Sequence, residues 1–133
     1  MLQLDDIDQK IINLLQLDSR LSHKEIGQRV HRTGQAVGMR ITQLIEQGII
    51  QKYTITVNHQ HKQFIQLYLN EQQSFTEVEY LVKQYSQIQE CHKVLGKACY
   101  MVVSNFEPQD LNQFIEKISQ WCRYSVETVI KTI

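Results

Sequence analysis

Apolar residues recur at helical spacing three times in the first fifty residues of the chain. Over residues 5–17 this spacing predicts an amphipathic helix, with Asp5 or Asp6 as its N-cap. Within residues 21–50 it predicts two shorter helices joined by a turn at residues 31–33. The apolar positions that carry the pattern are Ile7, Ile11, Leu14, Leu15, Leu21, Ile26, Val30, Val37, Ile41, Leu44 and Ile45.

The two shorter helices carry their own start and stop signals. Ser22 and Glu25 have the spacing of a capping box, and Thr33 can cap the second helix through its hydroxyl. Gly48 stands where glycine commonly ends a helix. Two helices joined by a tight turn, the second with a polar face, are typical of a helix-turn-helix, whose second helix fits the DNA major groove. An ordinary helical hairpin in a small domain is the alternative.

Beyond Gly48 the helical spacing gives way to alternation. Residues 49–57 alternate as a strand does and predict either a small wing or a linker strand. The rest of the chain alternates strand and helix in the order β-α-β-β-α-β, with a hairpin turning near residues 96–97 and a helix that starts at Pro108. That order is the ferredoxin-like arrangement, in which two helices pack on one face of an antiparallel sheet. The predicted strands of this half are residues 62–70, 88–95, 98–105 and 124–133.

The sequence therefore predicts an α+β chain with two domains. We assign residues 1–50 to a winged helix-turn-helix, residues 51–61 to a strand or linker, and residues 62–133 to the ferredoxin-like domain. Two helices cover only one face of a sheet, and apolar side chains on the other face need burial against a second copy. We therefore expect a homodimer formed through the second domain. The residues assigned to the uncovered face are Tyr68, His92, Tyr100, Val102, Val126 and Ile130.

Composition narrows the class of protein. The chain has 133 residues, of which 42% are hydrophobic, and no apolar run long enough to cross a membrane. Asp5, Asp6 and Asp8 stand where a signal peptide would be basic and then apolar, so we expect a cytoplasmic protein. The three cysteines show no C-x-x-C spacing and are expected to be free thiols.

Charge indicates a nucleic-acid partner only through its distribution. The formal net charge is zero, but residues 23–52 hold five lysines and arginines against two glutamates. A small basic patch predicts modest affinity per subunit, so more than one DNA-binding unit is needed. Glutamine and arginine side chains can make paired hydrogen bonds to base edges. We assign major-groove contacts to Thr33, Gln35, Met39, Arg40 and Gln43, and phosphate contacts to Ser22, Lys24, Arg29 and Arg32.

Histidines and cysteines of the second half raise the question of a metal or redox site. His59 and His61 fall in a predicted connection. Cys91 and His92 alternate across a strand, so these side chains do not converge and we expect no metal. Cys91 and Cys99 lie on neighbouring strands but not directly opposite, which favours packing over a redox switch. We find no paired acid and base, no phosphate-cradling glycine loop and no activated nucleophile, so we expect neither an enzyme nor a cofactor.

A helix-turn-helix joined to a β-α-β-β-α-β half resembles the Lrp/AsnC (leucine-responsive, feast/famine) family of prokaryotic transcription regulators. The most specific stretches are LDDIDQKIINLLQLDSRLSHKEIGQRV at 4–30, RITQLIEQGIIQKYTITVN at 40–58 and IQECHKVLG at 88–96. The resemblance implies that the first half binds double-stranded DNA, with Ala36 on the recognition-helix face. It also implies that the second half dimerises, commonly assembles further into octamers, and binds a small effector, often an amino acid, where dimers meet.

The effector half departs from the family pattern. Members that sense amino acids tend to have G-D-x-D-Y where this chain has Gly96, Lys97, Ala98, Cys99 and Tyr100. Both acidic positions are lost, and Lys97 would repel an ammonium group or attract an anion. We assign effector binding to these five residues, and we do not expect them to hold an amino acid through the usual contacts.

Two other functions stay open from the sequence alone. Some Lrp-like proteins act as sirohaem decarboxylases, so the fold does not exclude catalysis. A nucleoid-packing protein would need few base-specific residues. Affinities for specific and random DNA, measured at several salt concentrations, distinguish such a protein from a regulator. We favour a sequence-specific transcription regulator that binds a pseudo-palindromic site as a dimer or larger assembly.

Overall fold

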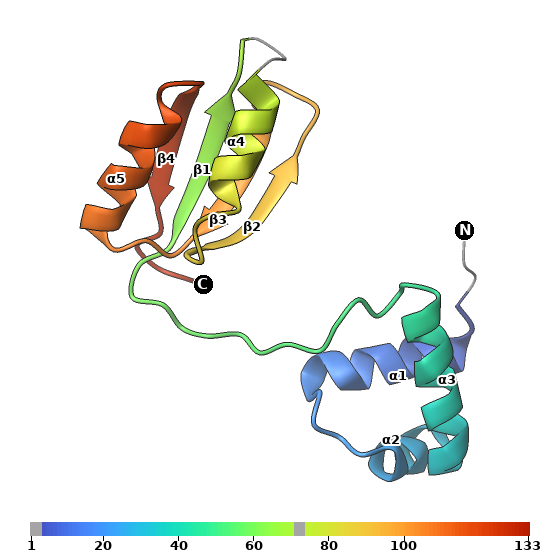
Figure 1. Cartoon of the computed structure of the whole chain (residues 1–133). Coiled ribbons are helices and arrows are strands. Elements are labelled where there is room, and N and C mark those ends of the chain that lie inside the picture. The colour runs from blue at the N-terminus through green and yellow to red at the C-terminus, as the bar shows by residue number, and fades with distance from the viewer. Residues whose placement is uncertain (1–3, 71–73) are drawn as a thin grey trace. The chain divides into compact units, whose positions relative to one another are not determined.

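The computed structural model describes residues 4–70 and 74–133, which form two compact units (Figure 1). The first unit extends to Thr56 and the second begins at Val57, inside the connection predicted over residues 51–61. None of the helices within the described residues is both long and apolar enough to span a membrane.

The first unit contains three helices, which are the three predicted from the apolar spacing. They are α1 (Asp6–Leu17), α2 (His23–Val30) and α3 (Gly34–Glu46) (Figure 1). Isolated helices of this length are marginal in water, so burial of their apolar faces must hold them in place. The buried residues of this small core are Ile11, Ile26, Val30, Val37 and Ile41.

Side chains and backbone close the ends of these helices. Asp5 caps α1: its carboxylate accepts the N–H of Asp8 at 2.7 Å, and the Asp8 carboxylate accepts the N–H of Asp5 at 3.4 Å. Thr33 caps α3 by accepting the N–H of Ala36 at 3.1 Å, which confirms its predicted role. Gly48 has φ 74°, a left-handed conformation that suits the end of α3.

The second unit is a four-stranded antiparallel sheet with two helices on one face, which confirms the ferredoxin-like prediction. The strands lie in the order β2-β3-β1-β4, so the second and fourth strands of the chain form the edges. Figure 1 shows both helices on the same side of the sheet. The elements are β1 (Gln63–Tyr68), α4 (Phe75–Val82), β2 (Ile88–Lys93), β3 (Tyr100–Ser104), α5 (Pro108–Ile118) and β4 (Arg123–Thr128).

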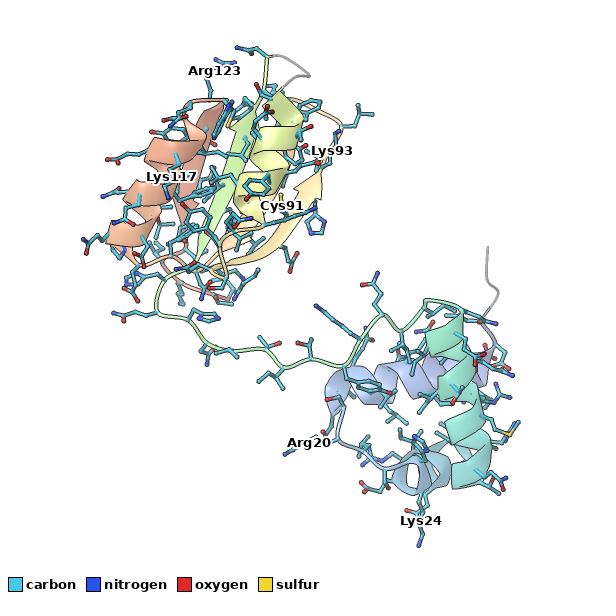
Figure 2. The ribbon with its side chains drawn as sticks, in the orientation of Figure 1. Arg20, Lys24, Cys91, Lys93, Lys117 and Arg123 are labelled. Atoms are coloured by element: carbon cyan, nitrogen blue, oxygen red, sulfur yellow. The ribbon has the colours of Figure 1, made fainter. Side chains whose placement is uncertain are left out.

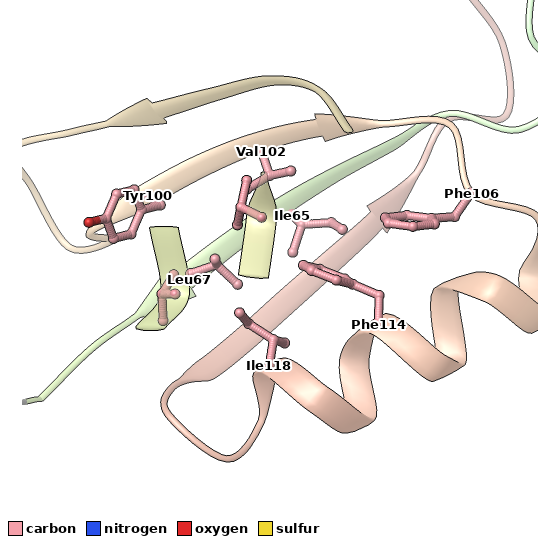
Figure 3. Close-up of a cluster of buried hydrophobic side chains, with 9 residues drawn as sticks. Ile65, Leu67, Tyr100, Val102, Phe106, Phe114 and Ile118 are labelled. Atoms are coloured by element: carbon pink, nitrogen blue, oxygen red, sulfur yellow. The ribbon is translucent and has the colours of Figure 1, made fainter. Parts of the chain in front are cut away.

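Aromatic rings fill part of the core between the sheet and the helices (Figure 3). Phe106 and Phe114 stack with ring centroids 5.1 Å apart. Tyr85 packs edge-on against both rings, 5.5 Å from Phe106 and 5.1 Å from Phe114. The buried residues of this core are Ile65, Leu67, Val78, Val82, Tyr100, Val102, Phe106, Phe114 and Ile118.

A buried amide ties the start of β1 to the end of β3. Gln63 is 2% exposed. Its side-chain oxygen accepts the hydroxyl of Ser104 at 2.8 Å and the N–H of Phe106 at 2.9 Å, while its Nε2 donates to the Phe106 carbonyl at 2.9 Å. A buried polar side chain is tolerated when its hydrogen bonds are made, as they are here.

The register of the strands corrects part of the assignment of sheet faces. Ile65 pairs with both Val102 and Val126, and residues directly opposite each other in antiparallel strands share a face. Val102, Val126 and Tyr100 therefore lie beneath the helices, and the prediction that they face outward is wrong; Tyr100 is 2% exposed. Ile130 lies beyond the last strand. Tyr68 and His92 do lie on the uncovered face, as predicted. That face also carries Phe64, Gln66, Met101, Val103 and Ser125, together with the charged residues Glu90, Arg123 and Glu127.

The strand predicted over residues 49–57 is absent. Residues 51–59 form neither helix nor strand, and residues 51–60 are all exposed. A strand needs a hydrogen-bonded neighbour, and within the described residues no strand of the four-stranded sheet pairs with this segment. The sequence alternates apolar and polar residues here, but the predicted wing or linker strand does not form.

The edge strand β2 pairs irregularly with β3. Ile88 lies opposite Ser104, but the next pair is Glu90 with Val103, so the register shifts at Gln89. An extra residue on one strand is a β-bulge, which bends the strand and increases its twist. Every residue of β2 after Ile88 is exposed, so this edge is both bent and in contact with solvent.

Candidate nucleic-acid interface

The exposed side of α3 carries the central side chains predicted for the major groove. Gln35, Met39 and Gln43 recur every four residues and are all exposed, Met39 to 62%. They lie opposite the buried face of the helix, so no core contact occupies them. The two amides can donate and accept hydrogen bonds, and the methionine can contact apolar groups such as a thymine methyl.

Three predicted contacts at the helix starts also take part in local structure. The Thr33 hydroxyl caps α3, and Ala36 is half-buried beside it. The Ser22 hydroxyl accepts the N–H of Glu25 and donates to the Glu25 carboxylate, each at 3.1 Å. Both hydroxyls therefore sit at helix N-termini, where free N–H groups and the helix dipole favour anions such as phosphate.

A tight turn fixes α2 against α3. His31 adopts φ 57° and ψ 46°, the left-handed conformation that glycine accepts most easily. The N–H of Arg32 then donates to the carbonyl of Gly27 at 2.9 Å. A Cβ on Gly27 would lie 2.4 Å from the Arg32 carbonyl oxygen, so this glycine permits the close approach of the turn to the helix.

The predicted phosphate contacts on α2 and the turn are open to solvent. Lys24, Arg29 and Arg32 are exposed, and Figure 2 shows Lys24 extending away from the helices. The Arg32 guanidinium donates to the carbonyl of His31 at 2.9 Å, which orients it along the turn. These cations have no carboxylate partner within the described residues.

Arg40 differs from the other predicted DNA contacts because its side chain is engaged within the unit. Its Nη1 donates to Asp5 at 2.7 Å and to Asp8 at 3.0 Å, and its side chain is 28% exposed. The hydrogen bond from Arg40 lowers the pKa of Asp5, with help from the N–H of Asp8, and both carboxylates raise the pKa of Arg40. The sequence showed the two acids at capping distance but gave no signal for a partner more than thirty residues away.

The residues predicted to bind an effector divide into an exposed and a buried set. Gly96 and Lys97 are exposed at the tip of the β2–β3 hairpin, whereas Ala98 is 8% exposed. Tyr100 is buried under α4, where its hydroxyl donates to Glu79 at 2.6 Å. Burial, followed by the carboxylate of Glu79, raises the pKa of the Tyr100 phenol. The tip of the hairpin is therefore exposed to solvent, whereas Tyr100 at the start of β3 is held in the core.

The cysteines do not come together. Cys91 lies opposite Val102, and Cys99 accepts the N–H of Leu69 through its sulfur at 3.4 Å. Cys91, Cys99 and Cys122 are all free. Residues 4–70 and 74–133 contain no group of three side chains placed to hold a metal ion.

Comparison with known families gives two adjacent matches. The family model described as the AsnC-type helix-turn-helix domain matches residues 4–45. The model described as the Lrp/AsnC ligand binding domain matches residues 62–133. The first match lies in the first compact unit and the second match lies in the second unit.

Individual proteins match over most of the chain. The transcriptional regulator LrpB of Bacillus subtilis is 31% identical over 138 residues, which cover 99% of this chain and 92% of LrpB. The leucine-responsive regulatory protein of Escherichia coli is 34% identical over 106 residues, covering 74% of this chain and 65% of that protein. Among solved structures, LrpC of Bacillus subtilis has a TM-score of 0.89 at 27% identity, covering 99% of this chain and 98% of its own. A Neisseria meningitidis regulator in complex with L-Met shares the fold, with a TM-score of 0.86 at 20% identity over 98% of this chain and 92% of its own.

Proposed function

Because this chain belongs to the Lrp/AsnC family of helix-turn-helix transcriptional regulators, we propose that it recognises its DNA sites through the uncovered face of α3. The observation that carries the proposal is the row of exposed side chains Gln35, Met39 and Gln43 on the second helix of the motif. A helix of this size fits the major groove, and amides aimed outward can distinguish base edges.

Phosphate contacts follow from the surroundings of α3. Lys24, Arg29 and Arg32 carry exposed charge beside the helix, and Ser22 and Thr33 lie at helix N-termini. Contacts of this kind set register and affinity but carry no sequence information. We propose Ala36 as an apolar contact at the edge of the recognition face.

We further propose that two copies associate through the uncovered face of the sheet. Phe64 is 41% exposed there, and Met101 and Val103 lie beside it without a covering helix. Apolar side chains on such a face are stabilised by burial, and a symmetric dimer buries the same patch of both copies. A dimer also brings two recognition helices to one DNA site, which offsets the small charge of each unit.

Selection of DNA from a random pool tests the first proposal. The full chain should enrich a pseudo-symmetric sequence, which it binds about 1,000-fold or more tightly than random duplex at physiological salt. Equal binding of selected and random duplexes, with the same salt dependence, would favour a nucleoid-packing role. The region upstream of the protein's own gene is the first natural duplex to test.

Sedimentation equilibrium of two matched variants tests the dimer. Phe64→Glu places a charge on the uncovered sheet face and should yield monomers. Tyr80→Glu changes an aromatic residue that is 68% exposed on α4, and it should leave the association state unchanged. Loss of the dimer in the Tyr80 variant alone would move the interface to the helices.

For the effector, we propose an anionic ligand at the tip of the β2–β3 hairpin. Gly96 and Lys97 are exposed there, and Lys97 supplies positive charge. Cys99 is half-buried at its base, beside the buried Ala98 and Tyr100. A neutral amino acid carries an ammonium group that the lysine repels, so carboxylates without an amine should bind better.

Thermal-shift measurements with paired ligands test this ligand class. Each 2-oxo acid should raise the melting temperature more than the amino acid of the same carbon skeleton. Lys97→Gln should remove the difference. A larger shift with the amino acids would overturn the proposed class.

A further inference from the structure

Arg40 connects α3 to the capping box of α1. Each of the two acids of that box uses one carboxylate oxygen for the helix cap and the other for Arg40. Asp5 accepts the N–H of Asp8 on Oδ1 and the Arg40 guanidinium on Oδ2. Asp8 accepts the N–H of Asp5 on Oδ2 and the guanidinium on Oδ1. One nitrogen of Arg40 thus bonds to both residues that define the start of α1.

The position of Arg40 on α3 suits a link between helices. It lies three residues after the buried Val37 and four before the buried Leu44, so it borders the core and not the centre of the exposed face. Its side chain is 28% exposed, while Asp8 is 19% exposed. Partial burial reduces solvent screening and strengthens hydrogen bonds between charged groups.

We propose that Arg40 is a positioning residue for DNA recognition, which fixes α3 against the start of α1 and does not itself contact a base. This role rests on the proposed function of the α3 face. The Arg40 link sets the angle at which Gln35, Met39 and Gln43 meet the groove. It replaces the sequence-based assignment of Arg40 to the major groove.

The charge of the Arg40 cluster allows an experiment to distinguish a positioning role from a direct contact with DNA. The three side chains together carry a net charge of about −1 at neutral pH, since two carboxylates face one guanidinium. Such a cluster repels phosphate. If Arg40 contacted DNA directly, loss of the Asp8 charge would free it and strengthen binding. If Arg40 positions α3, loss of either partner weakens binding.

The test compares Arg40→Gln, Asp8→Asn and the double variant in the full chain. The probes are the duplex selected by the unaltered protein and a random duplex of equal length and composition. Each single variant should weaken binding to the selected duplex about tenfold, the factor that corresponds to one charge-assisted hydrogen bond. The double variant should lose little more than either single one, because the same link is broken in all three. The slope of affinity against salt should not change, since no phosphate contact is removed.

Arg20→Gln is the matched control. Arg20 pairs with Asp18 at 3.3 Å beyond the end of α1 and its side chain is 90% exposed, so the variant removes an equal charge that links no helices. We expect its affinity to stay within about twofold of the unaltered chain, because exposed pairs contribute little. Arg40→Lys, which keeps the charge but not the fork of a guanidinium, guards against simple misfolding and should show an intermediate loss.

Three outcomes would overturn the inference. If Asp8→Asn tightens binding to the selected duplex by a larger factor than to the random duplex, Arg40 contacts a base. A smaller salt slope for Arg40→Gln would show that Arg40 contacts phosphate. Repeated selection with Arg40→Gln that changes one base of the preferred site would assign Arg40 to base recognition. Failure of the unaltered chain to enrich any sequence would instead overturn the proposed function, and with it the role of Arg40.

Discussion

The two units reach a defined structure by different physical means. In the first, three short helices share a core of five buried residues, and caps, a left-handed residue and a glycine contact determine how they meet. In the second, nine buried residues lie between a sheet and two helices, with stacked aromatic rings near the centre. The first unit supplements a small apolar core with caps and close backbone contacts, whereas the second has the larger apolar core.

This difference suits the two tasks. The proposed recognition helix must hold an angle against DNA, and side chains locked by packing and by hydrogen bonds maintain such an angle. The second unit, for which we propose dimerisation, must stay folded while another copy covers one sheet face, and a large core supplies that stability. Each unit should therefore fail under a different kind of change.

Among these changes, removal of a buried side chain from the core of the second unit should lower stability the most, and it should lower the stability of that unit alone. Phe114→Ala deletes a fully buried ring that stacks on Phe106 and should cost about 3–5 kcal/mol of stability. Trp121, the single tryptophan, packs against this core, so urea unfolding followed by its fluorescence reports on this unit. Helical circular dichroism comes from both units, so only the part from α4 and α5 should be lost with the fluorescence, and the part from α1, α2 and α3 should persist to higher urea concentrations. Coincident loss of both signals would contradict independent units.

The first unit should be most sensitive to changes at Gly27, where the helix and the turn approach each other closely. Gly27→Ala forces a Cβ to 2.4 Å from the Arg32 carbonyl and should cost about 2 kcal/mol, with loss of DNA binding and no change in Trp121 fluorescence. Gly38→Ala is the control: its Cβ would meet the His23 ring at 2.8 Å, but that flexible side chain can turn away. The gain in helix propensity there, about 1 kcal/mol, should leave the unit at least as stable. Equal damage from both variants would show that space at the turn is not the cause.

Opposite pH extremes should weaken the two units. The pKa of Asp5 is lowered from 3.8 by its hydrogen bond from Arg40, so the stability it contributes is present above that pH and is lost as pH falls through the lowered value. Burial raises the pKa of Cys122 from 9.0 to about 11, so the second unit loses stability as pH rises across that range. Circular dichroism in acid measures the loss of stability of the first unit. Trp121 fluorescence in alkali measures the loss of stability of the second unit. Cys122→Ala should reduce the alkaline loss, and an unchanged loss would assign it to another group.

The smallest effect on stability should come from the recognition face itself. Gln43→Ala removes an exposed side chain and should change the stability of either unit by no more than about 0.5 kcal/mol. Binding to the selected duplex should nevertheless weaken by roughly 1–3 kcal/mol if the amide pairs with a base. Titration of both duplexes measures this. Weakening on random duplex by the same factor would place Gln43 at the phosphates.

Local signals explain why the first unit was largely predictable. Apolar spacing located α1, α2 and α3, and the Thr33 cap and Gly48 stop depend on residues close in sequence. The exposure of Gln35, Met39 and Gln43 follows from the same periodicity. The hydrogen bonds from Arg40 to Asp5 and Asp8 were not predicted, because these partners lie at the start of another helix and no local pattern encodes such a contact.

In the second unit, the order of elements was predictable but the faces were only partly so. β3 is apolar at both Val102 and Val103, on opposite faces, so alternation could not decide which face is buried. The register with Ile65 decides it, and register depends on pairing across the sheet. Residues 49–57 show the converse case, since their alternation is clear but no strand among the described residues pairs with them.

The register shift in β2 has a consequence for solubility. Exposed sheet edges recruit other chains and seed open-ended fibres, because their backbone groups lack partners. Here the displaced residue Gln89 bends one such edge, and the exposed Glu90 and Lys93 would place charge against any incoming strand. Growth along that edge is disfavoured, which agrees with the proposed association of two copies through the flat face, where a twofold axis would close the assembly. The bulge thereby protects a concentrated protein from polymerising along this edge of the sheet.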